Sequence, residues 1–181
     1  MRVITGTARG RRLQSAPGTH TRPTSQRVKE AIFSIIQFDI EGRRVLDLFA
    51  GTGQLGIEAI SRGAEHAVLL ENHPGALSVI RENLRYTGFS DRATVVAGDV
   101  SSAGYASLGP FDIIFMDPPY RSPLLATSID AIVTADLLRP GGVMLCECDR
   151  SEQPLHPPPP YAFDRVYRYG AKSVFLYRRT S

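Results

Sequence analysis

The sequence lacks any apolar stretch long enough to span a membrane. Behind the charge at Arg2 it also lacks the apolar segment that forms the centre of a signal peptide. We therefore expect a cytoplasmic protein with no membrane contact. Its 181 residues, 43% of them hydrophobic, correspond to one domain of ordinary size that can bury a substantial core.

Cysteine is scarce as well. Cys146 and Cys148 are the only two, and they lie within an apolar run that we expect to form a strand. Side chains two positions apart in a strand point the same way, so a disulfide between them is sterically implausible. Two cysteines without a second pair or nearby histidines do not form a zinc site, and we expect buried thiols and no metal.

Acidic residues are missing from the first part of the chain, and lysine is nearly missing from all of it. Seven of the 21 basic residues precede Glu30, the first acidic residue: Arg2, Arg9, Arg11, Arg12, Arg22, Arg27 and Lys29. Arginine favours two-point contacts with phosphate, although the same preference can reflect genome composition. We expect the N-terminal segment to be a basic arm that binds nucleic acid.

The start of the chain predicts a hairpin. Arg2 to Thr5 and Arg11 to Gln14 resemble two short strands joined through Gly6 and Gly10. The basic side chains would lie on the exposed face of this hairpin.

A helix is expected next. Thr24 is a suitable N-cap, and apolar residues from Val28 to Ile36 recur at spacings of three and four. Arg27 and Lys29 in the first turn have the wrong sign for the helix dipole. Either another benefit keeps them there, or they lie on a solvated face.

From residue 44 onward, segments typical of strands and helices alternate. We expect strands at 45–49, 67–70, 93–97, 111–116 and 143–147, and helices at 53–62, 74–86 and 124–135. This alternation predicts a parallel sheet with helices on both faces. After four prolines at 157–160, residues 163–169 and 173–178 predict an antiparallel hairpin around Gly170.

Acidic side chains fall at the ends of four expected strands: Asp47, Glu71, Asp99 and Asp117. In doubly wound sheets, ligands bind beyond the carboxyl ends of the strands, at the point where the strand order reverses. These four residues are therefore candidates for one binding site. The alternative for each acid is that it caps a helix or hydrogen-bonds a loop. As a set the four favour a binding site, but for Asp99 taken by itself we do not prefer that site over the alternative.

The glycine-rich loop at 51–56 allows two interpretations. It matches G-x-G-x-x-G, and Glu71 lies at the right distance to hold a ribose, so a nicotinamide enzyme has to be considered. A carboxylate as close as Asp47 would repel a pyrophosphate, whereas it suits the ammonium group of S-adenosylmethionine. We favour S-adenosylmethionine, held by Asp47 and the loop, with its ribose at Glu71 and its adenine beside Asp99.

The tetrapeptide Asp117-Pro118-Pro119-Tyr120 follows a buried strand. The two prolines lack N–H groups and have fixed φ angles, so the backbone leaves the sheet rigidly and its carbonyl oxygens have no strand partners. Asp-Pro turns are common, but this combination with an aromatic residue is rare at the end of a buried strand. It is a pre-organised acceptor site.

Several of these segments resemble the RsmD family, bacterial methyltransferases that act on a guanine N2 of 16S ribosomal RNA. The resemblance rests on Asp47 to Gly53, Gly56, Glu58-Ala59, Ser61 to Ala64 and Asp117 to Tyr120. The N-terminal segment before residue 41, here called the leader, also resembles that of the family. The matching residues are Arg2 to Gly6, Gly10 to Leu13, Thr21 to Thr24, Arg27, Glu30-Ala31 and Phe33. Adenine-N6 and other amino methyltransferases share the D-P-P-Y segment, so the leader is what indicates the RNA family. Thr52, Gln54 and the prolines at 157–160 depart from the family's pattern.

The resemblance implies a Rossmann-like class I S-adenosylmethionine-dependent methyltransferase. Its α/β fold would have a mainly parallel seven-stranded sheet with a C-terminal antiparallel hairpin. A basic extension, residues 1–40, would precede the methyltransferase domain, residues 41–181. The expected partner is 16S ribosomal RNA within a small-subunit assembly particle, with no obligate protein partner.

The site residues that follow fall into three groups. Those expected to bind the cofactor are Asp47, Phe49, Gly51, Thr52, Gly53, Glu71, Asn72, Asp99, Val100 and Asp117. Those expected to take part in catalysis are Asp117, Pro118 and Tyr120. Those expected to bind RNA are Arg2, Arg9, Arg11, Arg12, Arg22 and Arg27.

Methylation of a guanine amine would require the hydrogen-bond acceptors at Asp117 to Tyr120. An exocyclic guanine amine is a poor nucleophile, because its lone pair is delocalised into the ring. Acceptors at Asp117 and the Pro118 carbonyl would hold its N–H groups and turn the lone pair toward the methyl donor. Tyr120 would stack on an unpaired or flipped base. An adenine-N6 or DNA methyltransferase, and a non-catalytic RNA-binding module, remain alternatives.

Overall fold

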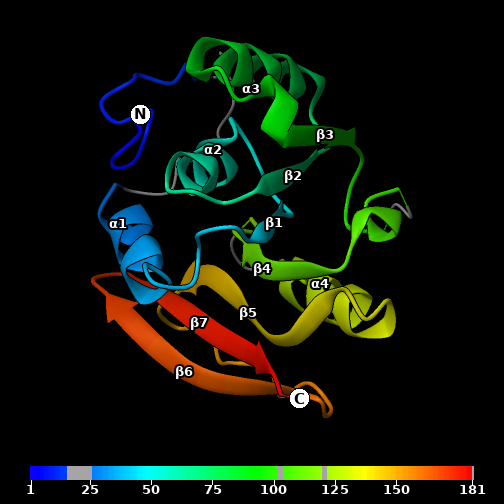
Figure 1. Ribbon diagram of the computed structural model, residues 1–181. Coiled ribbons are helices and arrows are strands. Elements are labelled where there is room, and N and C mark those ends of the chain that lie inside the picture. The colour runs from blue at the N-terminus through cyan, green and yellow to red at the C-terminus, as the bar shows by residue number, and fades with distance from the viewer. Residues whose placement is uncertain (16–25, 102–103, 120–121, 181) are drawn as a thin grey trace.

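A seven-stranded sheet organises the chain (Figure 1). In the computed structural model, residues 1–15, 26–101, 104–119 and 122–180 are described. The strands are β1 (Arg44–Asp47), β2 (His66–Glu71), β3 (Ala93–Ala97), β4 (Phe111–Met116), β5 (Leu138–Asp149), β6 (Tyr161–Tyr169) and β7 (Lys172–Arg179). The helices are α1 (Gln26–Ile35), α2 (Gln54–Ser61), α3 (Pro74–Thr87) and α4 (Leu124–Thr134).

The strand order is β3-β2-β1-β4-β5-β7-β6. β1 to β5 pair in parallel, and β7 is antiparallel to both of its neighbours. The order reverses between β1 and β4, because the chain moves outward from β1 to β2 and β3 and then returns to the other side of β1. The prediction of a mainly parallel seven-stranded sheet with a C-terminal hairpin is confirmed.

Both faces of the central strands are covered. Alternate residues of a strand point to opposite faces, so Val45 and Ile113 belong to one buried cluster while Leu46 and Ile114 belong to the other. Apolar residues of α1, α2 and α3 join the first cluster, and those of α4 join the second. This double burial explains why the central strands are continuous apolar runs.

The expected boundaries of β3 and β4 agree with the structure, whereas β5 begins earlier than expected. Leu138 already pairs with Phe111, and the register then shifts before Val143 pairs with Ile113. A Cβ atom at Gly142 would lie 2.9 Å from the Asp112 carbonyl oxygen, so this irregularity depends on glycine. The strand was expected to begin only at Val143, and the pairing of Leu138 with β4 extends it toward the N-terminus.

The predicted N-terminal hairpin is short: its arms pair at the antiparallel bridge between Arg2 and Arg12, through the bonds Val3 N–H to Arg11 carbonyl and Leu13 N–H to Met1 carbonyl. The backbone N–H groups of Ile4 and Thr5 instead donate to the Glu58 carboxylate, at 2.8 and 3.0 Å. Since these donors bind α2, they cannot form a strand ladder, and the expected extent of the two strands was wrong.

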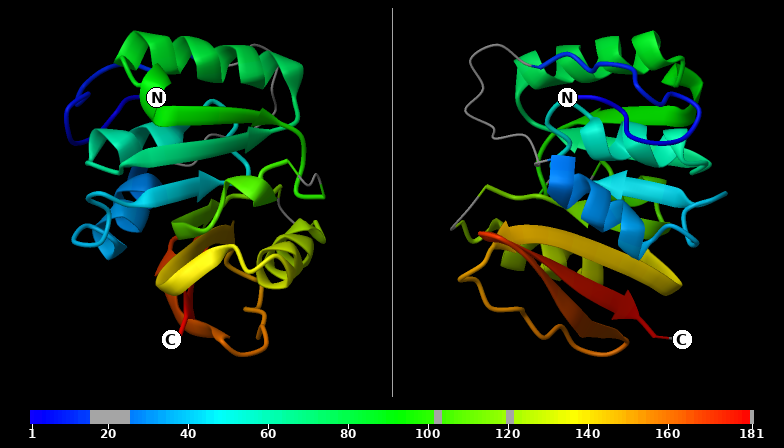
Figure 2. Two further views of the ribbon diagram at one scale, coloured as in Figure 1. Left: turned by 45° about the vertical axis from the view of Figure 1, so that its right-hand side comes forward. Right: turned by 90° about the vertical axis from the view of Figure 1, so that its left-hand side faces the viewer.

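The leader and α1 pack on the main domain, as expected of the helix. Val3, Leu13 and Phe33 belong to the same buried cluster as residues of β1 and α2. Figure 2 shows the start of the chain, in dark blue, running beside α2 and α3. The division between residues 1–40 and 41–181 stays a prediction. Thr24, the expected N-cap, lies outside the described residues.

Both cysteines are buried free thiols in β5, as predicted. Burial raises the pKa of Cys148 to about 12 and that of Cys146 well above its ordinary value. Across the described ranges, no helix has the length and apolar character needed to cross a membrane.

Candidate active site

Asp47 and Asp117 meet where the strand order reverses. Asp47 is the last residue of β1 and lies in register with Phe115 of β4, two residues before Asp117. The Leu48 N–H group continues the pairing by donating to the Phe115 carbonyl at 3.1 Å. The carboxyl ends of β1 and β4 therefore bring both acids to one edge of the sheet.

Asp47 is completely buried. Its pKa is raised to about 7, chiefly by burial and also by the charges of Asp117 and Glu71, while the N–H groups of Gly56 and Phe49 oppose the shift. Its Oδ2 accepts the Gly56 N–H at 3.2 Å, in the first turn of α2. Among the described residues, Oδ1 has no hydrogen-bond partner of normal geometry. The carboxylate thus has the capping role that we kept as an alternative, and still leaves one acceptor oxygen unsatisfied.

The glycine-rich loop lies between β1 and α2. Gly53 is the N-cap of α2 and has a left-handed conformation (φ 83°), which glycine adopts without strain. A Cβ atom at Gly51 would meet nothing within 4 Å, so the loop borders open space there. Phe49 precedes the loop and Thr52 lies within it, and both are partly exposed.

Glu71 holds the neighbouring loops together. Its Oε2 accepts the Gly51 N–H at 2.8 Å, and its Oε1 accepts the N–H groups of Asn72 and His73 at 2.9 and 2.8 Å. Asn72 is exposed. Glu71 therefore has the loop role that we kept as an alternative, and this role also attaches it to the glycine-rich loop.

Asp99 behaves differently from the other acids. It is exposed, and one carboxylate oxygen accepts the Ser101 N–H at 2.9 Å and the Ser101 hydroxyl at 2.5 Å. These contacts are the local explanation that we kept open for this residue. Val100 beside it is buried, and its carbonyl accepts the Tyr105 hydroxyl at 2.8 Å.

The chain leaves the sheet directly after β4, as the prolines predicted. Asp117 is partly buried, Pro118 is buried and Pro119 is exposed. The Pro119 carbonyl accepts the Ser122 hydroxyl at 2.7 Å, so the turn is also fixed by a side chain. Tyr120 lies outside the described residues.

Comparison with known proteins identifies the family. The family model described as Conserved hypothetical protein 95 matches residues 1–178. A Haemophilus influenzae protein named Ribosomal RNA small subunit methyltransferase D is 30% identical over 182 residues, 98% of this chain and 93% of the relative. The chain belongs to the RsmD family. The Bacillus subtilis protein YlbH, named as a candidate rRNA methyltransferase, is 36% identical over 99% of both chains.

Solved structures agree with this assignment to the RsmD family. YhhF of Escherichia coli, described as a candidate methyltransferase, has a TM-score of 0.85 and 31% identity, with 99% of this chain and 98% of that chain covered. An RNA methyltransferase from Salinibacter ruber, solved with S-adenosyl-L-homocysteine, has a TM-score of 0.68. At 18% identity over 88% of this chain and 95% of that one, it shows a shared fold alone.

Outside the candidate active site, a buried ion-pair network centred on Glu58 attaches the leader to α2. The buried Glu58 carboxylate pairs with Lys29 Nζ at 3.1 Å and with Arg62 Nε at 2.8 Å, in addition to the two leader N–H groups. Lys29 Nζ also donates to the Arg2 carbonyl at 2.7 Å. Burial lowers the pKa of Lys29, while Glu58 opposes that shift. This buried ion pair is the benefit that offsets the unfavourable position of Lys29 in the first turn of α1. The alternative, that Lys29 lies on a solvated helix face, is wrong.

Asn83 is a connecting residue that sequence reasoning missed. From the buried side of α3, its Oδ1 accepts the Gln14 N–H at 2.8 Å, and its Nδ2 donates to the Gln14 and Thr52 carbonyls at 3.2 and 2.9 Å. It thereby joins the leader to the glycine-rich loop. The sequence feature that could have indicated this role is a polar residue next to Leu84, on the inward face of the predicted helix.

The predicted RNA-binding arginines of the described leader and α1 are exposed: Arg2, Arg9, Arg11, Arg12 and Arg27. None of the ion pairs found within the described ranges includes them. Arg11 also has a side-chain contact inside the protein, because its Nη1 donates to the Tyr86 carbonyl at 2.5 Å. Arg22 lies outside the described residues.

Proposed function

We propose that this protein transfers a methyl group from S-adenosylmethionine to the N2 amine of a guanine in 16S ribosomal RNA. The observation that carries the proposal is the meeting of Asp47, Glu71 and Asp117 at the reversal point of the sheet. The names of relatives such as Ribosomal RNA small subunit methyltransferase D support the RNA substrate.

The residues fit the cofactor. The unsatisfied Oδ1 of buried Asp47 suits an ammonium group, and the open space at Gly51 leaves room beside it. Glu71 would hold the ribose hydroxyls, while Asn72, Asp99 and Val100 would border the adenine. Phe49, Thr52 and Gly53 would complete the binding loop. When bound, S-adenosylmethionine supplies an electrophilic methyl group on a positively charged sulfur.

Asp117 and Pro118 would prepare the nucleophile. The Asp117 carboxylate and the Pro118 carbonyl accept the two N–H groups of the guanine amine, so the nitrogen can pyramidalise with its lone pair toward the donor. Positive charge develops on this nitrogen during transfer, beside a carboxylate that is already in place. Tyr120 would stack on the base, which has to be unpaired or flipped out. The exposed leader arginines, with Arg22, would bind phosphates.

Replacing Asp117 tests the catalytic role. Asp117→Ala removes the acceptor that holds the guanine amine, so methylation of 16S RNA should fall by about 100-fold or more. Binding of S-adenosylmethionine should be largely retained, because Asp47, Glu71 and the glycine-rich loop would still hold the cofactor. Single-turnover methylation and calorimetry measure the two quantities. Asp130→Ala, at an exposed position of α4, is the control. Near-normal turnover of the Asp117 variant would rule out the proposed role.

Defined substrates separate the alternatives. Methylation of guanine-free RNA would indicate an adenine-N6 enzyme, and failure to bind S-adenosylmethionine would indicate an RNA-binding module without turnover. Comparing naked 16S RNA with assembly particles tests whether the particle is the substrate. Mapping methylated guanines in RNA from cells with and without the gene identifies the nucleotide.

A further inference from the structure

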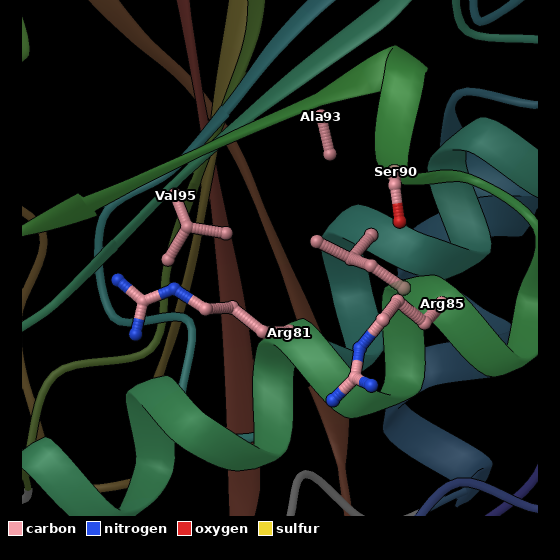
Figure 3. Close-up of a pocket in the computed structure, with 6 residues that line it drawn as sticks. Arg81, Arg85, Ser90, Ala93 and Val95 are labelled. Carbon is pink, nitrogen blue, oxygen red and sulfur yellow. The ribbon is translucent and has the colours of Figure 1, made fainter.

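Two grooves lie side by side on the edge of the molecule formed by α3 and β3. The first, about 390 Å³, is lined by Arg81, Leu84, Arg85, Ser90, Ala93 and Val95 (Figure 3). The second, about 530 Å³, is lined by Gln14, Glu82, Arg85 and Tyr86. Because Arg85 borders both, they form one surface, which we call the α3 edge surface. None of its residues was expected to bind a ligand.

The first groove is positively charged. Arg81 and Arg85 are four residues apart and so extend from the same face of α3, as Figure 3 shows. Like charges at this spacing weaken a helix. The C-terminal position of Arg85 is favourable for the helix dipole, but Arg81 lies further from the helix end.

Neither Arg81 nor Arg85 forms an ion pair with another described residue, whereas Arg62 and Arg179 are paired with acids. Glu82 is the acidic residue that lines the second groove. Two exposed guanidinium groups along one groove are well suited to the phosphates of a nucleic acid.

An aromatic side chain completes the surface. Tyr86 is 57% exposed, and the Arg11 guanidinium lies 5.7 Å from its ring centroid. Arg11 also donates to the Tyr86 carbonyl, and so joins the leader to the end of α3. An exposed ring beside arginines is a combination that binds single-stranded RNA by base stacking and phosphate contacts.

We propose that the α3 edge surface binds a single-stranded segment of the RNA substrate, with Arg81 and Arg85 on its phosphates and Tyr86 stacked on a base. This inference rests on the proposed function and extends it beyond the leader. Arg81 and Arg85 lie about 10 and 16 Å along α3 from Pro74, which follows β2. The surface therefore contributes affinity and orientation, and takes no part in methyl transfer.

The double variant Arg81→Ala/Arg85→Ala tests this inference through RNA binding. Affinity for a 16S RNA transcript at about 0.1 M salt should fall about 10- to 100-fold, and the slope of log affinity against log salt should become shallower by about 1.4. Tyr86→Ala should weaken binding about 5- to 100-fold with little change in the slope. Unchanged affinity for S-adenosylmethionine would show that each variant is folded.

The control is Arg165→Ala/Arg168→Ala, which removes the same charge from β6 at the opposite edge of the sheet. A smaller loss of RNA affinity in this control supports the α3 edge surface. Equal losses in both double variants, or no loss in the α3 variant, would overturn it. Because the assay reads binding, the surface can fail while methylation persists, and methylation can fail while the surface binds RNA.

Discussion

At the scale of single residues, the surroundings of each carboxylate in this site decide its ionisation and its hydrogen bonds. Asp47 ends β1 and Asp99 closely follows β3, yet Asp47 is fully buried with one unsatisfied oxygen, while Asp99 is exposed and bonded to Ser101. Burial disfavours the ionised form of Asp47, and a cationic ligand would restore it. This residue therefore links protonation to ligand binding.

Cofactor affinity should accordingly depend on pH. With the pKa of Asp47 at about 7, binding of the S-adenosylmethionine cation should tighten by about tenfold from pH 6 to pH 8, as the carboxylate ionises. Calorimetry at both pH values measures the change. Asp47→Asn should bind more weakly at pH 8 and lose this dependence. A wild-type affinity that is flat over this range would exclude Asp47 as the partner of the ammonium group.

The same pKa shift affects stability in the absence of ligand. The folded pKa of about 7 lies above the ordinary value of 3.8, so between these values the folded state holds a proton that the unfolded state has lost. The contribution of Asp47 to stability is full below pH 4 and disappears as the pH rises through 7. Urea titrations should show this decline as a difference between wild type and Asp47→Asn, whose side chain does not titrate.

At the scale of elements, α2 has two functions. Its first turn follows the glycine-rich loop, and its buried Glu58 holds both the leader and α1. Gly6 lies so close to α2 that a Cβ atom there would be 1.7 Å from the Ser61 carbonyl oxygen. The helix is therefore the common support of the proposed cofactor loop and the proposed RNA-binding arm.

Breaking the buried pair on this helix should be costly. Lys29→Met leaves the Glu58 carboxylate with one fewer cationic partner, and we expect the free energy of unfolding to fall by about 3 kcal/mol. Urea denaturation measures the change. Arg27→Met, an exposed position on the same turn of α1, should change it by less than about 0.5 kcal/mol. Equal stability of the two variants would show that the pair contributes nothing net.

At the scale of the whole molecule, Asn83 connects the leader to the glycine-rich loop. Its amide contacts the main chain of Gln14 on one side and the Thr52 carbonyl on the other. If RNA binds the leader and the cofactor binds the loop, each ligand should affect the affinity for the other by the same factor. Asn83 bonds to both segments, and the Thr52 hydroxyl of the loop also donates to Met1 Sδ at 3.8 Å.

Removing this connection should uncouple the two ligands. In wild type we expect RNA to tighten S-adenosylmethionine binding by about fivefold or more, and Asn83→Ala should reduce this factor toward one. Calorimetry with and without 16S RNA gives the factor. Gln14→Ala is the control, since Gln14 uses its main chain for both bonds to Asn83. A factor unchanged in Asn83→Ala would show that the coupling, if present, uses another route.

Much of this architecture followed from local patterns. Ala93–Ala97 and Phe111–Met116 were predicted with their observed boundaries. Phe111–Met116 was recognisable because a strand buried on both faces is a largely apolar run. Asp47, Glu71 and Asp117 were predicted as one site, because parallel strands place their carboxyl ends at one edge. The early start of β5 was missed, because pairing of Leu138 with Phe111 depends on a neighbouring strand.

The sequence by itself determined the alternation of strands and helices, the rigid turn after β4 and the presence of acids at strand ends. These features depend on properties of individual residues and on short periodic patterns. Only the tertiary structure decided that Lys29 is buried against Glu58, that Asn83 bonds to both leader and loop, and that Arg81 and Arg85 border a groove with β3. Such contacts join residues far apart in the chain, and a pattern along the sequence does not contain them.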